Sequence, residues 1–411
     1  MSAAALYSSV EQTRARAFPP SLVFVTLLMA SIPLENVTVL PQIGSISRLL
    51  GLLAVGAVLM DGVVALGFRR LHIAHLPLAL FVLWSAWTWF WSINPELTSE
   101  RMSTNLQLLI LVWLTWQSVR NLAQLRLVLQ GFVLGSCCAA ILTMINSRGL
   151  TAVDAIRYSG AGADPNELSL TMVLSLPMAY YLCATAHTPY SRLFWLIPIP
   201  VCIVGVILTV SRVGFLTTIV ALICISVWHM TSSSRMRLVP VVAGVVLIVL
   251  GFAFTPKANL ERLSTIGSEV SSGSIGKRAK LWTAGMIVFH QRPLTGTGAA
   301  TFADAIEPLL GENLAAHNVY VSVLTETGII GFLIFSLALI TCFMTAMHLS
   351  PPERALWLIV MVTWCIGVIS LTWEYKKVTW SVFGLLIASG ALPAHSPRAT
   401  LRMTADRLIR Q

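Results

Sequence analysis

The sequence predicts an all-α polytopic membrane protein of about twelve transmembrane helices, with one large loop between the ninth and the tenth. Of the 411 residues, 56% are hydrophobic and only 11% are charged, and the mean hydropathy is +0.80. Soluble globular domains carry roughly 25% charged residues, because their surface must be wetted. Apolar stretches of about 20 residues, long enough for a helix to cross a bilayer, recur along the whole chain.

The expected spans follow the apolar stretches and the polar residues that interrupt them. They cover residues 19–34, 46–65, 73–91, 104–118, 124–146, 167–186, 191–210, 213–230, 237–254, 317–347, 354–372 and 378–394. The stretch 317–347 is long for one crossing, so its helix is expected to begin outside the hydrocarbon layer. Residues 255–316 are too polar to span, since they hold many charges and a Ser/Gly-rich run.

This interpretation divides the chain into four parts. Residues 1–254 carry the first nine transmembrane helices, and residues 255–316 form an external loop with short helices. Residues 317–394 carry the last three transmembrane helices, and residues 395–411 form a basic cytoplasmic tail.

The distribution of basic residues predicts the orientation in the membrane. The loops on the side of the two termini hold fourteen Lys and Arg residues, and the opposite loops hold seven when the long loop is left out. Basic residues accumulate in short cytoplasmic loops, whereas long loops cross the membrane regardless of their charge. Both termini are therefore expected in the cytoplasm, and residues 255–316 on the outer side.

Several classes of protein are disfavoured by the same topology. The net charge of +10 can indicate a nucleic-acid partner, but here it follows from the cytoplasmic loops, so no nucleic acid is expected. The seven cysteines fall inside apolar spans, which predicts neither a disulfide framework nor a metal cluster. No outward-facing group has metal-ligand spacing, so no metal or other cofactor is expected. Glu326 is the one clearly deep acid; we expect it to serve packing, because a proton-coupled carrier would need several.

Two of the eight histidines, His290 and His317, fall on the outer side. His290 follows an amphipathic segment and is expected at the surface. His317 stands where the external loop enters the tenth span, and histidine is the most frequent general base because its ordinary pKa lies near 6.5. The simpler alternative is an interfacial histidine without a chemical task.

Outward-facing arginines favour an anionic ligand on this side. Arg212 lies at the outer junction of the seventh and eighth spans with almost no loop around it, where an arginine is costly unless it has a partner or an aqueous cavity. Arg157 and Arg278 also face outward, the latter near Lys280. A guanidinium fits a phosphate through two parallel hydrogen bonds. The headgroups of anionic lipids are the alternative ligand.

A group of tryptophans and a glycine-containing run on the outer side can be explained without a bound ligand. Trp84, Trp87, Trp89 and Trp91 end the third span, and we expect an interfacial aromatic belt there rather than a platform for sugars. The run Gly296-Thr297-Gly298 could let the backbone approach a ligand closely, but two glycines are a weak signal.

Short motifs occur in a fixed order between about residues 150 and 335. They are Arg157-Tyr158-Ser159-Gly160 leading to Asp164-Pro165-Asn166-Glu167-Leu168, Ser211-Arg212-Val213-Gly214, Arg278-x-x-x-Trp282 with Arg292-Pro293-Leu294-Thr295-Gly296, and His317-Asn318-x-Tyr320 with Glu326 and Gly331. In order, spacing and membrane side, this pattern resembles the superfamily of O-antigen ligases and polymerases, which are glycosyltransferases of the bacterial envelope. The first 150 residues match it only as a series of hydrophobic helices.

The resemblance implies a fold, a reaction and partners. The fold would be that of a GT-C-like membrane glycosyltransferase of the bacterial inner membrane, with its site on the periplasmic face. The donor would be a glycan linked to undecaprenyl pyrophosphate, and neither a nucleotide sugar nor a metal ion would take part. A single base without a second nucleophile would make the transfer inverting. Membrane lipids would be further partners.

The resemblance also implies a role for each matched residue. His317 would be the general base that takes the proton of the acceptor hydroxyl. Arg212 and Arg278 would hold the pyrophosphate and stabilise the charge that grows as it leaves. The remaining candidates for donor and sugar binding are Arg157, Lys280, Trp282, Asn318 and Tyr320.

Three activities share these motifs, namely O-antigen ligation to the lipid A-core, polymerisation of polysaccharide repeats, and O-glycosylation of proteins. The compact length, the twelve expected spans and the single dominant outer loop resemble the ligases more. The protein-glycosylating members usually carry a soluble domain after the last helix, whereas here only the short tail follows. The expected activity is therefore ligation to the lipid A-core, with polymerisation as the alternative and a transporter or lipid-binding membrane protein as the non-enzymatic alternative.

Overall fold

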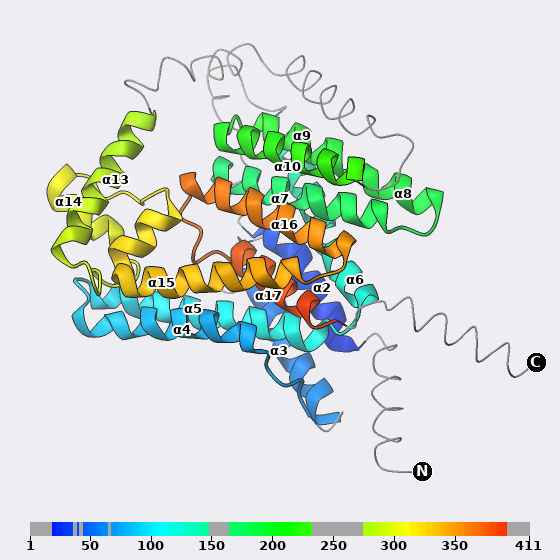
Figure 1. Cartoon of the computed structure of the whole chain (residues 1–411), viewed down its shortest axis with the longest axis horizontal. Helices are drawn as coiled ribbons and strands as arrows, with labels where there is room; N and C mark the ends of the chain where they lie inside the picture. Colours follow the sequence, from blue (N-terminus) through cyan, green and yellow to red (C-terminus); the bar gives the residue numbers. More distant parts are fainter. Residues whose placement is uncertain are drawn as a thin grey trace, which may run out of the picture.

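The computed structural model of the chain describes residues 19–35, 39–40, 44–64, 67–147, 164–231 and 274–392. The long helices lie side by side in an elongated bundle (Figure 1). Helices α13 (Ser274–Gln291) and α14 (Phe302–Leu310) lie at one end of it, on the left in Figure 1, and α8 (Pro189–Leu196) lies at the opposite end. The expected span 237–254, the tail 395–411 and the candidate Arg157 fall outside the described residues.

The other described elements follow in chain order. The helices are α2 (Pro20–Ser31), α3 (Ile46–Val64), α4 (Leu76–Trp87), α5 (Pro95–Ser118), α6 (Leu122–Ser147), α7 (Pro165–Ala184), α9 (Pro198–Leu208), α10 (Arg212–Thr231), α15 (Val319–Met347), α16 (Pro351–Gly367) and α17 (Lys377–Gly390). Short 3-10 helices adjoin them: η1 (Ile32–Leu34), η2 (Ile73–His75), η3 (Thr88–Trp91) and η4 (Val368–Ser370). The two-residue strands β1 (Val39–Leu40) and β2 (Gly44–Ser45) pair in antiparallel fashion.

Proline and short polar side chains determine where several helices begin. Proline occupies the first turn of α2, α5, α7, α8, α9 and α16, where it has no helical N–H bond to lose and its fixed φ suits the helix. Asn94 Oδ1 accepts the N–H of Leu97 at 3.3 Å, and Asp164 Oδ1 accepts the N–H of Asn166 at 2.7 Å. These caps satisfy amides that have no partner inside the helix, so the starts of α5 and α7 are fixed locally.

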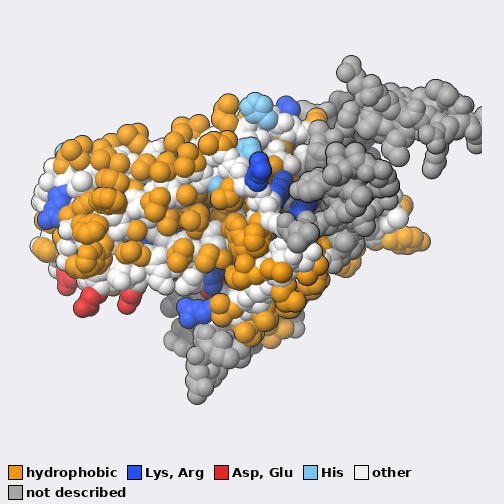
Figure 2. All heavy atoms as spheres, turned by 90° about the horizontal axis from the view of Figure 1, so that it is seen from below, with side chains coloured by type: hydrophobic (Ala, Val, Ile, Leu, Met, Phe, Trp, Pro, Cys, Tyr) orange, Lys and Arg blue, Asp and Glu red, His pale blue; other side chains and the backbone are white. Residues whose placement is uncertain are grey.

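The structure has the apolar helices of a multi-pass membrane protein. Eight of its described helical stretches are long and apolar enough to cross a membrane, and Pro20–Leu34 and Lys377–Gly390 are shorter apolar helices. These ten coincide with ten of the expected spans. The expected span 104–118 is the second half of α5, whose first half is polar, and the number of twelve stays a prediction. Hydrophobic side chains are spread widely over the described part of the face in Figure 2, as expected for contact with lipid.

A kink at Gly328 divides α15 into two parts. Gly328 has φ 66° and ψ −172°, a conformation open almost only to glycine. The amides of Ile329 and Ile330 therefore leave the helix, and they donate to the carbonyls of Pro293 and Leu294 at 2.8 and 3.4 Å. The loop between α13 and α14 thus supplies the acceptors that the broken helix lacks.

The same loop also satisfies the carbonyls that the kink releases. The N–H of Thr297 donates to the carbonyl of Thr325 at 3.1 Å, and the N–H of Gly298 donates to that of Glu326 at 2.9 Å. Gly296 has φ 71°, and a Cβ there would collide with the backbone of Glu326. The close approach that these glycines permit is therefore to the backbone of α15 rather than to a ligand.

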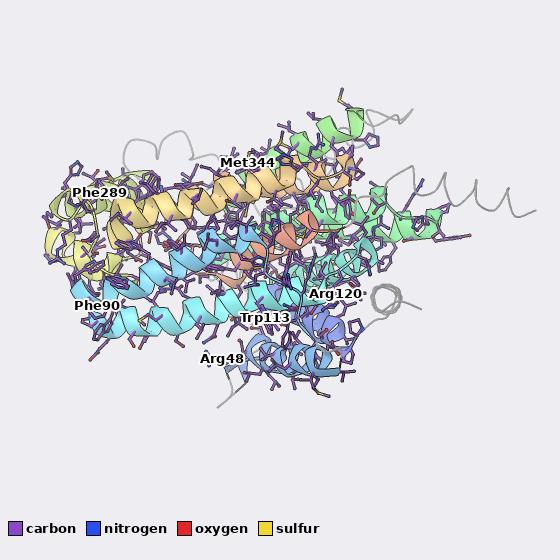
Figure 3. The ribbon with its side chains drawn as sticks, turned by 60° about the horizontal axis from the view of Figure 1, so that its bottom comes forward. Arg48, Phe90, Trp113, Arg120, Phe289 and Met344 are labelled. Atoms are coloured by element: carbon purple, nitrogen blue, oxygen red, sulfur yellow. The ribbon has the colours of Figure 1, made fainter. Side chains whose placement is uncertain are left out.

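The four tryptophans at the end of α4 divide into two pairs. Trp84 Nε1 donates to the carbonyl of Thr327 at 2.9 Å, and Trp91 Nε1 donates to that of Thr295 at 3.1 Å, so these two brace the kink. Trp87 and Trp89 are 62% and 45% exposed and are the pair that fits an interfacial belt. Phe90 and Phe289 lie at this end of the bundle, whereas Arg120 lies toward the other (Figure 3).

Candidate functional site

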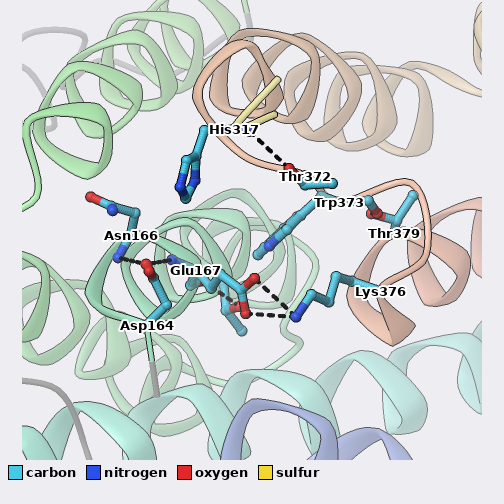
Figure 4. Close-up of polar contacts among 9 residues, drawn as sticks. Asp164, Asn166, Glu167, His317, Thr372, Trp373, Lys376 and Thr379 are labelled. Carbon is cyan, nitrogen blue, oxygen red and sulfur yellow. Dashed lines mark hydrogen bonds and ion pairs between the residues drawn. The ribbon is translucent and has the colours of Figure 1, made fainter. Parts of the chain in front are cut away.

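Segments from distant parts of the chain meet near the start of α15 (Figure 4). They are the start of α7, the turn between α9 and α10, residues 316–318, and the loop 371–376 between η4 and α17. Side chains of α17 hold this last loop: Thr379 Oγ1 donates to the carbonyl of Trp373 at 2.8 Å, and Trp380 Nε1 donates to the carbonyl of Glu374 at 2.8 Å. The loop is therefore a rigid part of the site.

His317 is half-buried directly before α15, and its backbone is held in an uncommon conformation. Its φ is 46°, in the left-handed region that non-glycine residues seldom adopt. Its N–H donates to Thr372 Oγ1 at 2.9 Å, and the imidazole points away from Thr372 into a space bordered by Asn166, Glu167 and Trp373 (Figure 4). The fold thus directs the imidazole toward the start of α7.

The two other candidates at the start of α15 already have structural contacts. Asn318 is the N-cap of α15, and its Oδ1 accepts the N–H groups of Tyr320 and Val321 at 2.9 and 3.1 Å. The Tyr320 hydroxyl donates to the carbonyl of Cys365 at 3.1 Å, across to α16. Both residues therefore help to fix the position of His317, and their contact with sugars stays a prediction.

Helix α13 approaches His317 through Trp282. Trp282 Nε1 donates to the carbonyl of Ala316 at 3.0 Å, directly before the histidine. Arg278 lies four residues earlier and therefore on the same face of α13. Lys280 is exposed and two residues away from Arg278, which places it on a different face. Trp282 therefore contacts the residue before His317, Arg278 lies on the same face of α13 as Trp282, and Lys280 lies on a different face.

Arg212 is the first residue of α10, and its neighbours are bonded to α7. Ser211 Oγ donates to Asn166 Oδ1 at 2.9 Å and accepts the N–H of Gly214 at 3.1 Å. Val210, just before, has φ 49°, which is unusual for a β-branched residue. Since Asn166 also borders the imidazole of His317 (Figure 4), this chain of contacts connects the segments that carry Arg212 and His317.

Two lysines to which the sequence analysis gave no role form ion pairs in this region. Lys376 Nζ pairs with Glu167 Oε1 at 2.9 Å, and Lys377 forms an ion pair with Glu35. Glu167 stood in a recognised motif, but nothing local in the sequence pointed to a partner 209 residues away. His290, expected at the surface, is exposed.

A buried polar cluster lies behind the site. Glu326 accepts the N–H of Ala300 at 2.8 Å and the hydroxyl of Tyr375 at 3.1 Å, so it joins the loop after α13 to the loop 371–376, as its expected packing role requires. The guanidinium of Arg101 lies 4.0 Å above the ring of Tyr375. Glu374 is fully buried, and neither of its carboxyl oxygens has a partner of good geometry in the described part of the chain. Burial, reinforced by the nearby Glu326, raises the pKa of Glu374 well above its usual range.

The arrangement combines a half-buried imidazole with basic side chains at helix ends. The start of α10 adds the partial positive charge of a helix N-terminus to the charge of Arg212, which suits an anionic group. In the described residues no group of three or more His, Cys, Asp and Glu side chains could hold a metal ion. The geometry is suited to proton acceptance next to a bound anion.

Fold and site together define a multi-pass helical membrane protein with an imidazole and arginines near one end of its bundle. Residues 199–336 match the family model described as O-antigen ligase. The resemblance predicted from the motifs is confirmed for this segment, which contains Arg212, Arg278 and His317. No curated protein matches the chain.

Proposed function

We propose that the protein is an O-antigen ligase of the bacterial inner membrane. It transfers O-antigen polysaccharide from undecaprenyl pyrophosphate to the lipid A-core on the periplasmic face, in lipopolysaccharide biosynthesis. The family match supports the class of enzyme. The resemblance of the motifs supports the donor and the acceptor, and the distribution of Lys and Arg supports the side of the membrane.

Strained backbone conformations at and near the main residues support the location of the proposed site. Val210, Ala300 and His317, with φ of 49°, 69° and 46°, are the non-glycine residues with positive φ in the described ranges. Each such conformation costs of order 1–3 kcal/mol and persists where the surrounding structure imposes it, most often at functional sites. One of the three is the proposed base, and another lies two residues before Arg212.

The proposed reaction is a single displacement at the anomeric carbon. The acceptor oxygen attacks this carbon while its proton passes to the imidazole of His317. The bond between the anomeric carbon and the pyrophosphate oxygen breaks, and the electron pair leaves with undecaprenyl pyrophosphate. Because attack and departure occur on opposite faces, the anomeric configuration inverts.

The arginines act on the leaving group. Negative charge grows on the pyrophosphate as the bond breaks, and fixed positive groups lower the barrier most where charge develops. Arg212, at the N-terminus of α10, and Arg278, on the face of α13 that carries Trp282, are the proposed donors. A pyrophosphate leaves readily, so no carboxylic acid is needed to protonate it.

Deletion of the gene in its own host tests the proposal, with lipopolysaccharide separated on a gel. The expected result is bare lipid A-core together with accumulated carrier-linked polymer, and the wild-type gene should restore the polymer ladder. Cores capped by a single repeat would instead identify a polymerase. A normal ladder in the deletion strain would refute both assignments.

A further inference from the structure

A cavity lies at the end of the bundle opposite to the His317 region. It has a volume of about 280 Å³ and is lined by the first turns of α6, the end of α7 and the start of α8. Figure 1 places α8 at the end far from α13 and α14. Small-molecule pockets range from roughly 300 to 1,000 Å³, so this cavity suits one small polar group rather than an extended ligand.

Most of the residues that line the cavity are polar, and Arg126 is one of them. Arg126 Nε is buried without a hydrogen-bond partner, while its guanidinium also contacts the hydroxyl of Tyr181, which donates to Glu353 at 2.7 Å. A buried N–H of a charged group without an acceptor is costly. Because this atom has no accessible surface, a turn of the side chain is needed to offer its N–H to an anionic oxygen in the cavity, which would then remove this cost.

Further donors surround the same space. Gln130 and Ser191 line the cavity, and so does Thr188, whose Oγ1 accepts the N–H of Ser191 at 3.2 Å. This bond uses an oxygen lone pair of Thr188 and leaves its O–H to donate. The cavity also opens at the N-terminus of α8, where the helix carries partial positive charge. Amide, hydroxyl and guanidinium donors together suit a phosphate.

The outer face of α8 indicates that this phosphate belongs to a lipid. Tyr190, Leu193 and Phe194 are 86%, 65% and 50% exposed, whereas Trp195 on the opposite face is buried and lines the cavity. A short helix with exposed apolar side chains and a polar pocket beneath it is typical of the membrane interface. A soluble phosphate compound would leave these apolar side chains exposed to water, whereas lipid acyl chains would cover them.

We infer that the cavity between α6, α7 and α8 binds the phosphate group of a membrane phospholipid, in the leaflet opposite to the His317 site. The guanidinium of Arg126 holds the phosphate, and the exposed side chains of α8 contact the acyl chains. This site is separate from the proposed transfer reaction and does not depend on it.

Native mass spectrometry of the purified full-length protein in detergent tests the inference. Phosphatidylglycerol is the probe, and dioleoylglycerol, which lacks the phosphate, is the lipid control. The wild-type protein should retain one phosphatidylglycerol that survives detergent washing and should not retain dioleoylglycerol. Arg126→Gln should lower the affinity at least tenfold, because a hydrogen bond to a charged group is worth about 1.5–3 kcal/mol.

Two further variants keep the test decisive. Ala186→Phe fills the cavity from its wall without removing the contacts of Arg126, and it should also abolish retention; it decides the question if Arg126→Gln does not fold. Arg70→Gln removes an exposed arginine that does not line the cavity and should behave as the wild type. Wild-type retention in a folded Arg126→Gln or Ala186→Phe protein would overturn the inference. Displacement of the lipid by millimolar inorganic phosphate would also overturn it, because it would identify a soluble ligand.

Discussion

The backbone N–H of His317 donates to the hydroxyl oxygen of Thr372 at 2.9 Å, across 55 residues of sequence. This bond attaches the strained residue before α15 to the loop before α17. It holds the backbone of the proposed base, so the orientation of the imidazole depends on a part of the chain far from it in sequence.

Replacement of Thr372 tests this dependence. Thr372→Val removes the acceptor while keeping the shape of the side chain. We expect a loss of about 1 kcal/mol in the free energy of unfolding and a fall in the transfer rate of about tenfold or more, since the base is no longer held in place. Thr372→Ser keeps the hydroxyl and should retain most of the rate. Equal rates for the Val and Ser variants would show that the bond has no part in catalysis.

Replacement of His317 by asparagine separates chemistry from backbone strain. Asparagine tolerates positive φ better than most residues, so the start of α15 should keep its conformation while the base is lost. We expect the transfer rate of the purified protein to fall by 10²–10⁴-fold, with little change in the thermal unfolding midpoint. A folded Asn variant that works at near the normal rate would mean that another group is the base.

Arg212→Lys tests whether the guanidinium binds the pyrophosphate through two parallel hydrogen bonds. A lysine keeps the charge but cannot copy the two parallel hydrogen bonds of a guanidinium. We expect kcat/KM for the lipid-linked donor to fall by about tenfold or more, as measured from initial rates over a range of donor concentrations. Arg48→Lys makes the same change on the exposed surface of α3 and should leave the rates unaltered. A similar, small effect of both changes would exclude a bidentate role for Arg212.

Gly328→Ala tests the kink of α15. A Cβ at this position would collide with the backbone of Leu294 and Thr295, and φ of 66° with ψ of −172° excludes alanine without strain of about 1–3 kcal/mol. We expect a lower thermal unfolding midpoint and reduced transfer, because the loop after α13 can no longer pair with α15. The matched control is Gly56→Ala inside α3, where no atom lies within 4 Å; it should be neutral or stabilising by roughly 0.5–1 kcal/mol. If the two alanine variants were equally stable, the kink would not need glycine.

Glu374 lies outside the membrane-spanning segments and should make stability fall with rising pH. Burial raises its pKa, so the folded protein retains a proton that the unfolded chain releases above the ordinary Glu pKa of about 4.3. The unfolded state then binds fewer protons, and the free energy of unfolding decreases as pH rises from that value toward the raised pKa. Glu374→Gln removes this slope and should unfold at a higher temperature than the wild type at pH 8. Unchanged pH dependence in this variant, compared with Glu312→Gln at an exposed position, would contradict the assignment.

The helices were predictable because their signals are local. Apolar stretches determine where the segments lie, and ten of the expected spans coincide with apolar helices of the structure. Hydropathy missed the break within the expected span 191–210, where Pro198 follows α8 and begins α9. The polar first half of α5 was also missed, because a search for apolar stretches starts only where the polar residues end.

The candidate site was predictable only in part. The motifs propose His317, Arg212, Arg278 and Trp282 as site residues, which stays a prediction, but they do not point to the residues that contact these segments. Thr372 has no distinctive sequence context, and its role exists only because the chain folds back over 55 residues. Glu374 stands two and three residues before Lys376 and Lys377, where a solvated charge would be the natural expectation, yet it is fully buried. Such roles arise from tertiary packing. The contacts between distant residues cannot be recognised in a single sequence.

The contacts of Asn166 and Thr372 have a consequence for transplanting this activity between proteins. The family match ends at residue 336 and begins at residue 199, whereas the partners of Ser211 and His317 lie outside it on both sides. A chimaera that exchanged only the matched segment would place the proposed reacting groups among the helices and loops of another protein, without their own hydrogen-bond partners. To retain its specificity and rate, the donor segment would have to bring the start of α7 and the loop before α17 with it.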